Sequence, residues 1–120
     1  QMHISVSTPN DGIDDMMRRL AATGLKVRIS EIDIAAGNGG AAGTPPAFAA
    51  LANQAVKYKY VVASYLRHVP PAQRGGITMW GLTDNTSWLY NNGAQYPLLY
   101  DNNFNRKPAY ASFLAALRGQ

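Results

Sequence analysis

The stretch Lys26–Asp33 reads Lys-Val-Arg-Ile-Ser-Glu-Ile-Asp, and the rest of the predicted fold is arranged around it. Its β-branched residues follow the stop signal Thr23-Gly24 and predict a strand. Because side chains alternate along a strand, we expect one shared face for Val27, Ile29, Glu31 and Asp33. Two apolar residues before two carboxylates indicate a buried strand that surfaces at its carboxyl end, where parallel α/β proteins place their chemistry. The alternative is a structural salt bridge from an acidic strand end to a nearby Arg or Lys.

Composition limits the class of protein. The 120 residues are 47% hydrophobic, which fits one modest globular domain or part of a larger one. The net charge of +4 is spread without a Lys/Arg run, so we predict no nucleic-acid partner. The lack of cysteine excludes thiol chemistry and disulfides. No apolar run approaches the roughly 18 residues that span a membrane, so no membrane partner is predicted either.

Strand and helix patterns alternate along the chain. Strands are predicted at 1–6, 26–33 and 77–82. A first helix carries Ile13, Met16, Met17 and Leu20 on one face, with Asp11 as its N-cap. A second runs from about Phe48 to Arg67 after Thr44 as cap and Pro45 at its first position, and a third starts at Pro108. The order β-α-β-α-β-α predicts parallel strands, either in an open sheet or in an arc of a (β/α)8 barrel.

Polar and aromatic residues follow or flank each predicted strand. In the barrel they would gather on one rim, and they are Gln1, His3, Glu31, Asp33, Trp80, Asp84 and Trp88. Indole faces stack on pyranose rings, while carboxylates, amides and imidazoles bond sugar hydroxyls. The strand ends therefore favour a sugar-binding site. The glycine-rich segment 35–43 lacks the spacing and the lysine of a phosphate-binding loop, and we interpret it as a rim loop.

Several motifs together resemble a known family. These are Gln1-x-His3, Ser30-Glu31-Ile32-Asp33, Trp80-Gly81-Leu82-Thr83-Asp84 with Ser87-Trp88, Pro97–Asp101 and Lys107-Pro108-Ala109-Tyr110. Over nearly the whole chain they are similar to the C-terminal portion of glycoside hydrolase family 10, retaining endo-β-1,4-xylanases on a (β/α)8 TIM barrel. The resemblance implies that residues 1–120 form a partial catalytic domain containing strands six to eight and their helices.

The resemblance also implies roles for site residues. Glu31 matches the catalytic nucleophile, His3 the residue that hydrogen-bonds it, and Asp33 its supporting acid. Gln1, Trp80 and Trp88 match groups that line the sugar subsite beside the cleavage point. No metal and no cofactor is implied. A secreted or cell-surface location is implied by the family rather than by any segment of this chain.

The second carboxyl group of a retaining glycosidase is missing from the pattern. Such an enzyme needs an acid/base roughly 5–5.5 Å from the nucleophile, and the family's acid/base is a Glu in an Asn-Glu pair. Glu31 is the only glutamate here, and Asp33 and Asp84 are the only acids expected at the rim. We therefore expect the nucleophile half of an active site, cut from a longer chain and inactive alone, acting on xylan or xylo-oligosaccharides with the missing N-terminal part of the barrel. The alternatives are another barrel β-glycanase, such as a cellulase, and a non-catalytic carbohydrate-binding remnant.

Overall fold

The computed structural model describes residues 1–37, 43–90, 93 and 95–120. Along the chain lie β1 (Met2–Ser5), α1 (Asn10–Ala21), β2 (Val27–Ala35), α2 (Phe48–His68), β3 (Arg74–Met79) and α3 (Pro108–Leu117). Two short 3-10 helices, η1 (Pro71–Gln73) and η2 (Asp84–Thr86), flank β3. The predicted β-α-β-α-β-α order is therefore confirmed for the described part of the chain.

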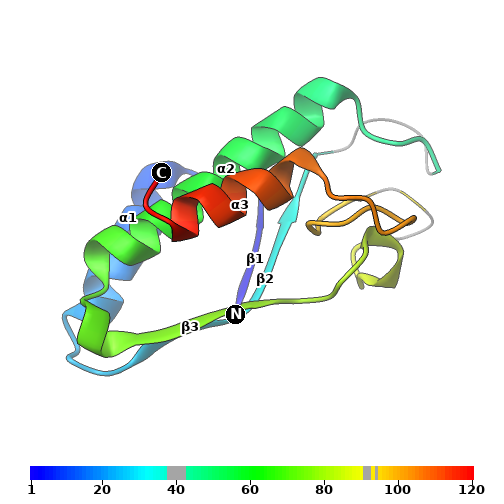
Figure 1. The fold of residues 1–120 in the computed structure, drawn as a ribbon. Coiled ribbons are helices and arrows are strands. Elements are labelled where there is room, and N and C mark those ends of the chain that lie inside the picture. Colours follow the sequence, from blue (N-terminus) through cyan, green and yellow to red (C-terminus); the bar gives the residue numbers. More distant parts are fainter. Residues whose placement is uncertain (38–42, 91–92, 94) are drawn as a thin grey trace.

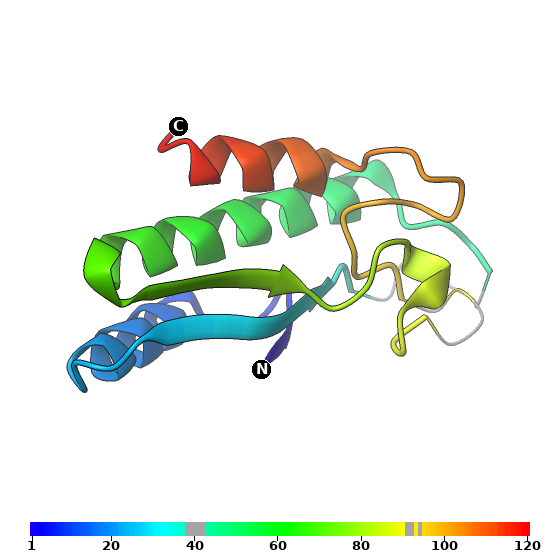
Figure 2. The same cartoon turned by 60° about the horizontal axis from the view of Figure 1, so that its bottom comes forward.

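The sheet has the order β1-β2-β3, and both strand pairs are parallel. A parallel connection between neighbouring strands is right-handed, so α1 and α2 cover the same face of the sheet. α2 lies in the middle of the helical layer, packed against α1 on one side and α3 on the other. Figures 1 and 2 show α2 and α3 side by side along their length. The fold is thus a parallel arc with its helices on the outside.

The hydrophobic core fills the space between this sheet and its helices. Tyr58, Val61 and Tyr65 of α2 meet Ile32 and Ile34 of β2 in one continuous cluster. α2 also carries polar links: the buried amide of Gln54 donates to the carbonyl oxygens of Ile34 and Tyr96, 2.7 and 2.6 Å away. The Tyr58 hydroxyl donates to Pro97 O over 2.6 Å. These bonds fix the segment before α3 against the carboxyl end of β2.

The alternation of β2 differs from the prediction. Ile29 pairs with Ile77 and Ile32 with Met79, so three steps along β2 match two along β3. This irregularity is a β-bulge, which reverses the sidedness of the residues beyond it. Val27, Ile29, Ile32 and Ile34 consequently all belong to the core cluster. The prediction that Val27 and Ile29 share a face with Glu31 and Asp33 is wrong.

Element boundaries differ from the predictions at several ends. Pro9 precedes α1 without a side-chain cap, and Asp11 lies inside the first turn, where it accepts the Gly12 N–H. α2 begins at Phe48 after Ala47, so Thr44 and Pro45 lie outside the helix. β3 begins at Arg74 and ends at Met79, which leaves Trp80 just beyond it. Most of the glycine-rich segment 35–43, interpreted above as a rim loop, lies outside the described residues.

The helix α2, with 21 residues, has about the length of a membrane-spanning helix. Neither α2 nor any other helix in the described ranges combines the length and apolar character that crossing a bilayer requires.

Candidate active site

The candidate site lies at the carboxyl end of β2, next to β1. His3 of β1 pairs directly with Asp33 of β2, while Met2 pairs with Ile32. Strand alternation then directs His3 and Asp33 away from the helices and Met2 and Ile32 toward the core. Glu31 lies two residues before Asp33 on the same side. The sheet register therefore brings an imidazole and two carboxylates together on its helix-free face.

Glu31 is held by a different donor at each carboxylate oxygen. Gln1 Nε2 donates to Oε1 over 3.0 Å, and His3 Nε2 lies 3.0 Å from Oε2. The Glu31 side chain is 17% exposed. Its orientation is fixed from two sides while solvent access is kept, which suits a carboxylate that must be ionised and must meet a substrate.

His3 bridges the two carboxylates. Its Nδ1 lies 2.9 Å from Asp33 Oδ2 and its Nε2 lies 3.0 Å from Glu31 Oε2. A neutral imidazole can donate through only one nitrogen, whereas the imidazolium donates through both. With both carboxylates ionised, the full set of hydrogen bonds thus requires two ring protons on His3.

Asp33 is completely buried, with 0% of its surface exposed. Its Oδ2 accepts a second hydrogen bond, from the indole Nε1 of Trp88 at 2.8 Å. The Trp88 and His3 rings meet edge to face, with centroids 5.2 Å apart. Trp88 is nevertheless 62% exposed. Its N–H edge therefore serves the buried carboxylate while most of the ring is open to solvent. This bond was not predicted; the only sequence signal for it is an N–H donor in the loop after β3.

Trp80 stands apart from that cluster. It follows β3 directly, its backbone N–H donates to Ile32 O over 2.9 Å, and it is 45% exposed. Within the described ranges no hydrogen bond or ring pair joins its side chain to the site residues on β1 and β2. The structure thus brings together Gln1, His3, Glu31, Asp33 and Trp88, and places Trp80 just beyond β3, next to β2.

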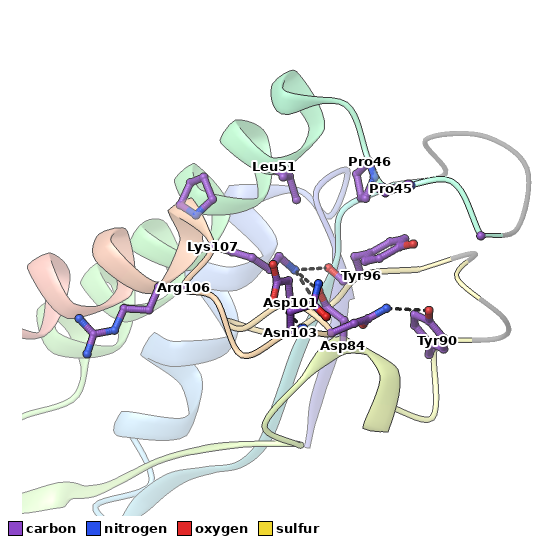
Figure 3. Close-up of a pocket in the computed structure, with 13 residues that line it drawn as sticks. Pro45, Pro46, Leu51, Asp84, Tyr90, Tyr96, Asp101, Asn103, Arg106 and Lys107 are labelled. Carbon is purple, nitrogen blue, oxygen red and sulfur yellow. Dashed lines mark hydrogen bonds and ion pairs between the residues drawn. The ribbon is translucent and has the colours of Figure 1, made fainter.

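Asp84 lies beyond the carboxyl end of β3, but it is not exposed there and so is not available as a rim acid. It is fully buried, and Lys107 Nζ contacts its Oδ1 and Oδ2 at 3.1 and 2.9 Å. The backbone N–H of Leu98 donates to Oδ1 over 2.7 Å. Figure 3 shows Asp84 and Lys107 with Tyr96, beside a cavity of about 410 Å³ that Pro45, Leu51 and Tyr90 also line. Asp84 is held in this ion pair by Lys107, which is distant in the sequence but lies next to it in the fold.

Burial and pairing act against each other in this pair. Burial raises the pKa of Asp84, and the Lys107 ammonium opposes that rise. Burial lowers the pKa of Lys107, and the Asp84 carboxylate opposes that fall. The short contacts to both carboxylate oxygens identify a charged pair that connects the start of η2 to the start of α3. A structural role follows, with no proton available for catalysis.

Across residues 1–37, 43–90, 93 and 95–120, no group of three or more His, Asp or Glu side chains is arranged to hold a metal ion.

Comparison with known proteins gives a consistent result. The family model for glycosyl hydrolase family 10 matches residues 1–116. Endo-1,4-beta-xylanase A of Cellvibrio japonicus is 36% identical over 100% of this chain and 22% of its own length. Exoglucanase XynX of Acetivibrio thermocellus is 32% identical over 92% of this chain and 9% of its own. A xylanase10C variant from Cellvibrio japonicus, solved in complex with xylopentaose, superposes with a TM-score of 0.90 at 36% identity, covering 100% of this chain and 27% of that one.

Proposed function

Because this chain belongs to glycosyl hydrolase family 10, we propose that it is part of a retaining endo-1,4-β-xylanase that hydrolyses xylan. The chain spans 22% of the length of the two Cellvibrio japonicus xylanases it matches. Its parallel three-stranded arc corresponds to strands six, seven and eight of a (β/α)8 barrel, with Glu31 at the end of strand seven. The remaining strands and the acid/base belong to the part of the barrel outside these 120 residues.

Glu31 is the nucleophile in this proposal. Its carboxylate attacks the anomeric carbon, the glycosidic bond to the leaving sugar breaks, and a covalent glycosyl-enzyme forms. Water then hydrolyses that ester with net retention of configuration. Gln1 and His3 orient the attacking carboxylate, one at each of its oxygens. Asp33 holds His3 from the other side.

The acid/base is supplied from outside this chain. Asp33 is buried and already accepts hydrogen bonds from His3 and Trp88. Asp84 is buried in its pair with Lys107. Neither carboxyl group is free to protonate a leaving oxygen, and the sequence has no second glutamate. This supports the nucleophile-half interpretation.

Sugar binding rests on the two indoles and an amide. Trp80 and Trp88 are both substantially exposed, as ring faces that stack on a xylose unit must be. Gln1, bonded to Glu31, lies where it could also reach a sugar hydroxyl. Xylan or xylo-oligosaccharide is thus the proposed ligand. Because xylan is a polymer found outside the cell, we also propose that the enzyme is secreted or held at the cell surface.

The proposal rests on one observation: Gln1 and His3 hold the two oxygens of Glu31 at the carboxyl end of the central strand β2. In the full-length protein, Glu31→Gln should reduce xylan hydrolysis by more than about a thousandfold while largely sparing xylan binding, since shape is kept and nucleophilicity is lost. Asp15→Asn is the matched control, because Asp15 is an exposed carboxylate on α1 whose partner, Arg18, lies on the same helix. Retention of more than a thousandth of the activity, or a fluorinated xylobioside trapped on another residue, would overturn the assignment of Glu31.

A cellulase-type specificity is the second candidate, favoured by the similarity to a protein named an exoglucanase. Parallel assays of the full-length protein on xylan and on a β-1,4-glucan decide between the two. Faster release of reducing ends from the glucan would transfer the proposal to that substrate. Binding to xylan without turnover of either polymer would identify a non-catalytic carbohydrate-binding protein.

A further inference from the structure

The indole N–H of Trp88 donates to the buried carboxylate of Asp33. Within the described residues, Asp33 Oδ2 accepts from His3 Nδ1 and Trp88 Nε1, while its Oδ1 has no hydrogen-bond partner. A fully buried carboxylate depends strongly on each donor it has, because water cannot replace a lost one. Trp88 therefore supplies half of the donors seen on Asp33.

We propose that Trp88 is a positioning residue that acts on the nucleophile through Asp33 and His3. This inference rests on the proposed function of Glu31. The bonds run from Trp88 Nε1 to Asp33 Oδ2, from that oxygen to His3 Nδ1, and from His3 Nε2 to Glu31 Oε2, at 2.8, 2.9 and 3.0 Å. Charge-assisted hydrogen bonds of this kind are the strong ones, and they couple when they share an atom.

The shared oxygen gives the coupling its sign. When Trp88 donates to Oδ2, it takes up part of the negative charge that Asp33 presents to His3. Without that donor, Asp33 draws the His3 ring and its proton more strongly, and the bond from His3 to Glu31 weakens. Among the described residues, the carboxylates within ion-pair distance of the His3 ring are Glu31 and Asp33, both on β2.

Trp88 is also placed to link sugar contact with this chain of bonds. Its ring is 62% exposed, whereas its N–H is directed to the buried carboxylate. The edge-to-face contact with His3, at 79° between the ring planes, restricts how the indole can turn. A sugar stacked on the open face would hold the N–H on Asp33.

The test is a double-mutant cycle in the full-length enzyme. Trp88→Phe keeps an aromatic ring but removes the N–H, and we expect kcat to fall about tenfold with a smaller change in KM, since a transition-state interaction is lost. In an Asp33→Asn background the same substitution should cost less than about threefold, because residues acting through one another are not additive. Trp80→Phe is the control: its effect should be equal in both backgrounds, because Trp80 makes no bond to Asp33.

A spectroscopic readout separates this inference from the proposed function. In Trp88→Phe, the Nδ1–H proton resonance of His3, observed by NMR, should move downfield from its wild-type position, because its hydrogen bond to Asp33 strengthens when Asp33 loses its second donor. This measurement needs no turnover, so it remains decisive even if Glu31→Gln stays active. Unchanged His3 shifts, or a Trp88→Phe effect confined to KM and additive with Asp33→Asn, would reduce Trp88 to a sugar platform.

Discussion

Single carboxyl groups in this chain are distinguished by their partners rather than by their residue type. Glu31 keeps access to solvent and is held by an amide and an imidazole. Asp33 is buried and is held by the same imidazole and an indole. Asp84, equally buried, is held by an ammonium group. Only the first of these environments leaves a carboxylate in contact with solvent, and this difference is the reason for proposing Glu31 as the nucleophile.

The Asp84–Lys107 pair yields a prediction about stability. Lys107→Met should lower the free energy of unfolding of the full-length protein by about 3–5 kcal/mol, because it leaves an uncompensated carboxylate in the interior. Urea denaturation followed by fluorescence measures this. The double variant Asp84→Leu/Lys107→Met should regain part of the loss, since no buried charge remains. A loss below about 1 kcal/mol for Lys107→Met would contradict the paired, structural assignment.

Gly81 supports a second prediction at this scale. Its φ is +130°, and an added Cβ would lie 2.7 Å from Leu98 Cδ1. Gly81→Ala should therefore destabilise the full-length protein by about 1–3 kcal/mol, through backbone strain and the clash. Gly12→Ala is the control: no atom lies within 4 Å of its added Cβ, and in a helix alanine should be neutral or stabilising. Thermal melts that rank the two variants in the reverse order would refute this account.

At the scale of whole elements, the contact between α1 and α2 is organised by one carboxylate. Asp14 of α1 accepts from Ser64 Oγ at 2.5 Å and from Tyr60 OH at 2.8 Å. Arg67 and His68, at the end of α2, lie 3.5 and 3.3 Å from its oxygens. This position gives His68 a structural role at the contact between the two helices. The hydrogen bonds from Ser64 and Tyr60 are the largest causes that hold the pKa of Asp14 below its ordinary value of 3.8.

This lowered pKa predicts a pH dependence of stability. A carboxyl group with a lower pKa in the folded state stabilises it above the unfolded-state value of about 3.8 and loses that effect as pH falls through the folded-state value. Asp14→Asn should therefore lower the melting temperature at pH 6 more than at pH 3. Asp15→Asn, one residue away and exposed, is the control and should leave the difference between the two pH values unchanged. Equal losses at both pH values would contradict the role of the Asp14 charge.

Sequence patterns predicted the elements well where the signal was local. The period of α1 and α2 and the start of α3 at Pro108 came from side chains within the same segment, and so did the polar end of β2. The N-caps failed because Pro9 and Ala47 provide the entry backbone without a side-chain bond. The bulge in β2 depends on pairing with β3, and Asp84 depends on Lys107, 23 residues away. Such contacts between distant segments have no signature in a local pattern.

At the scale of the whole molecule, the arc has two open sides. Among the described residues, β1 and β3 each pair only with β2, so each leaves one edge without a partner strand. Met16 and Leu20 of α1, predicted to face the core, are exposed. Unpaired edges and an uncovered helix face favour association with further strands and helices, as in a closed barrel.

We predict that a protein consisting of these 120 residues does not hydrolyse xylan. It has one glutamate, and neither Asp33 nor Asp84 can serve as acid/base. A reducing-sugar assay on xylan should give no turnover for the fragment, none for the complementary part of the full-length protein alone, and measurable turnover for the mixture if the two assemble. Sustained turnover by the fragment alone would contradict the half-site model and direct attention to Asp33.

The bulge in β2 also determines how the active-site strand could be transferred to another barrel. Before the bulge, the odd-numbered residues Val27 and Ile29 face the core. Beyond it, the even-numbered residues Ile32 and Ile34 face the core. The extra residue between Ile29 and Ile32 causes this change, because it reverses the side of the strand on which the following residues lie. A graft onto an uninterrupted host strand that aligned the odd positions would turn Glu31 and Asp33 toward the helices. Grafts must therefore carry the whole segment from Ile29 to Asp33, together with its irregular pairing.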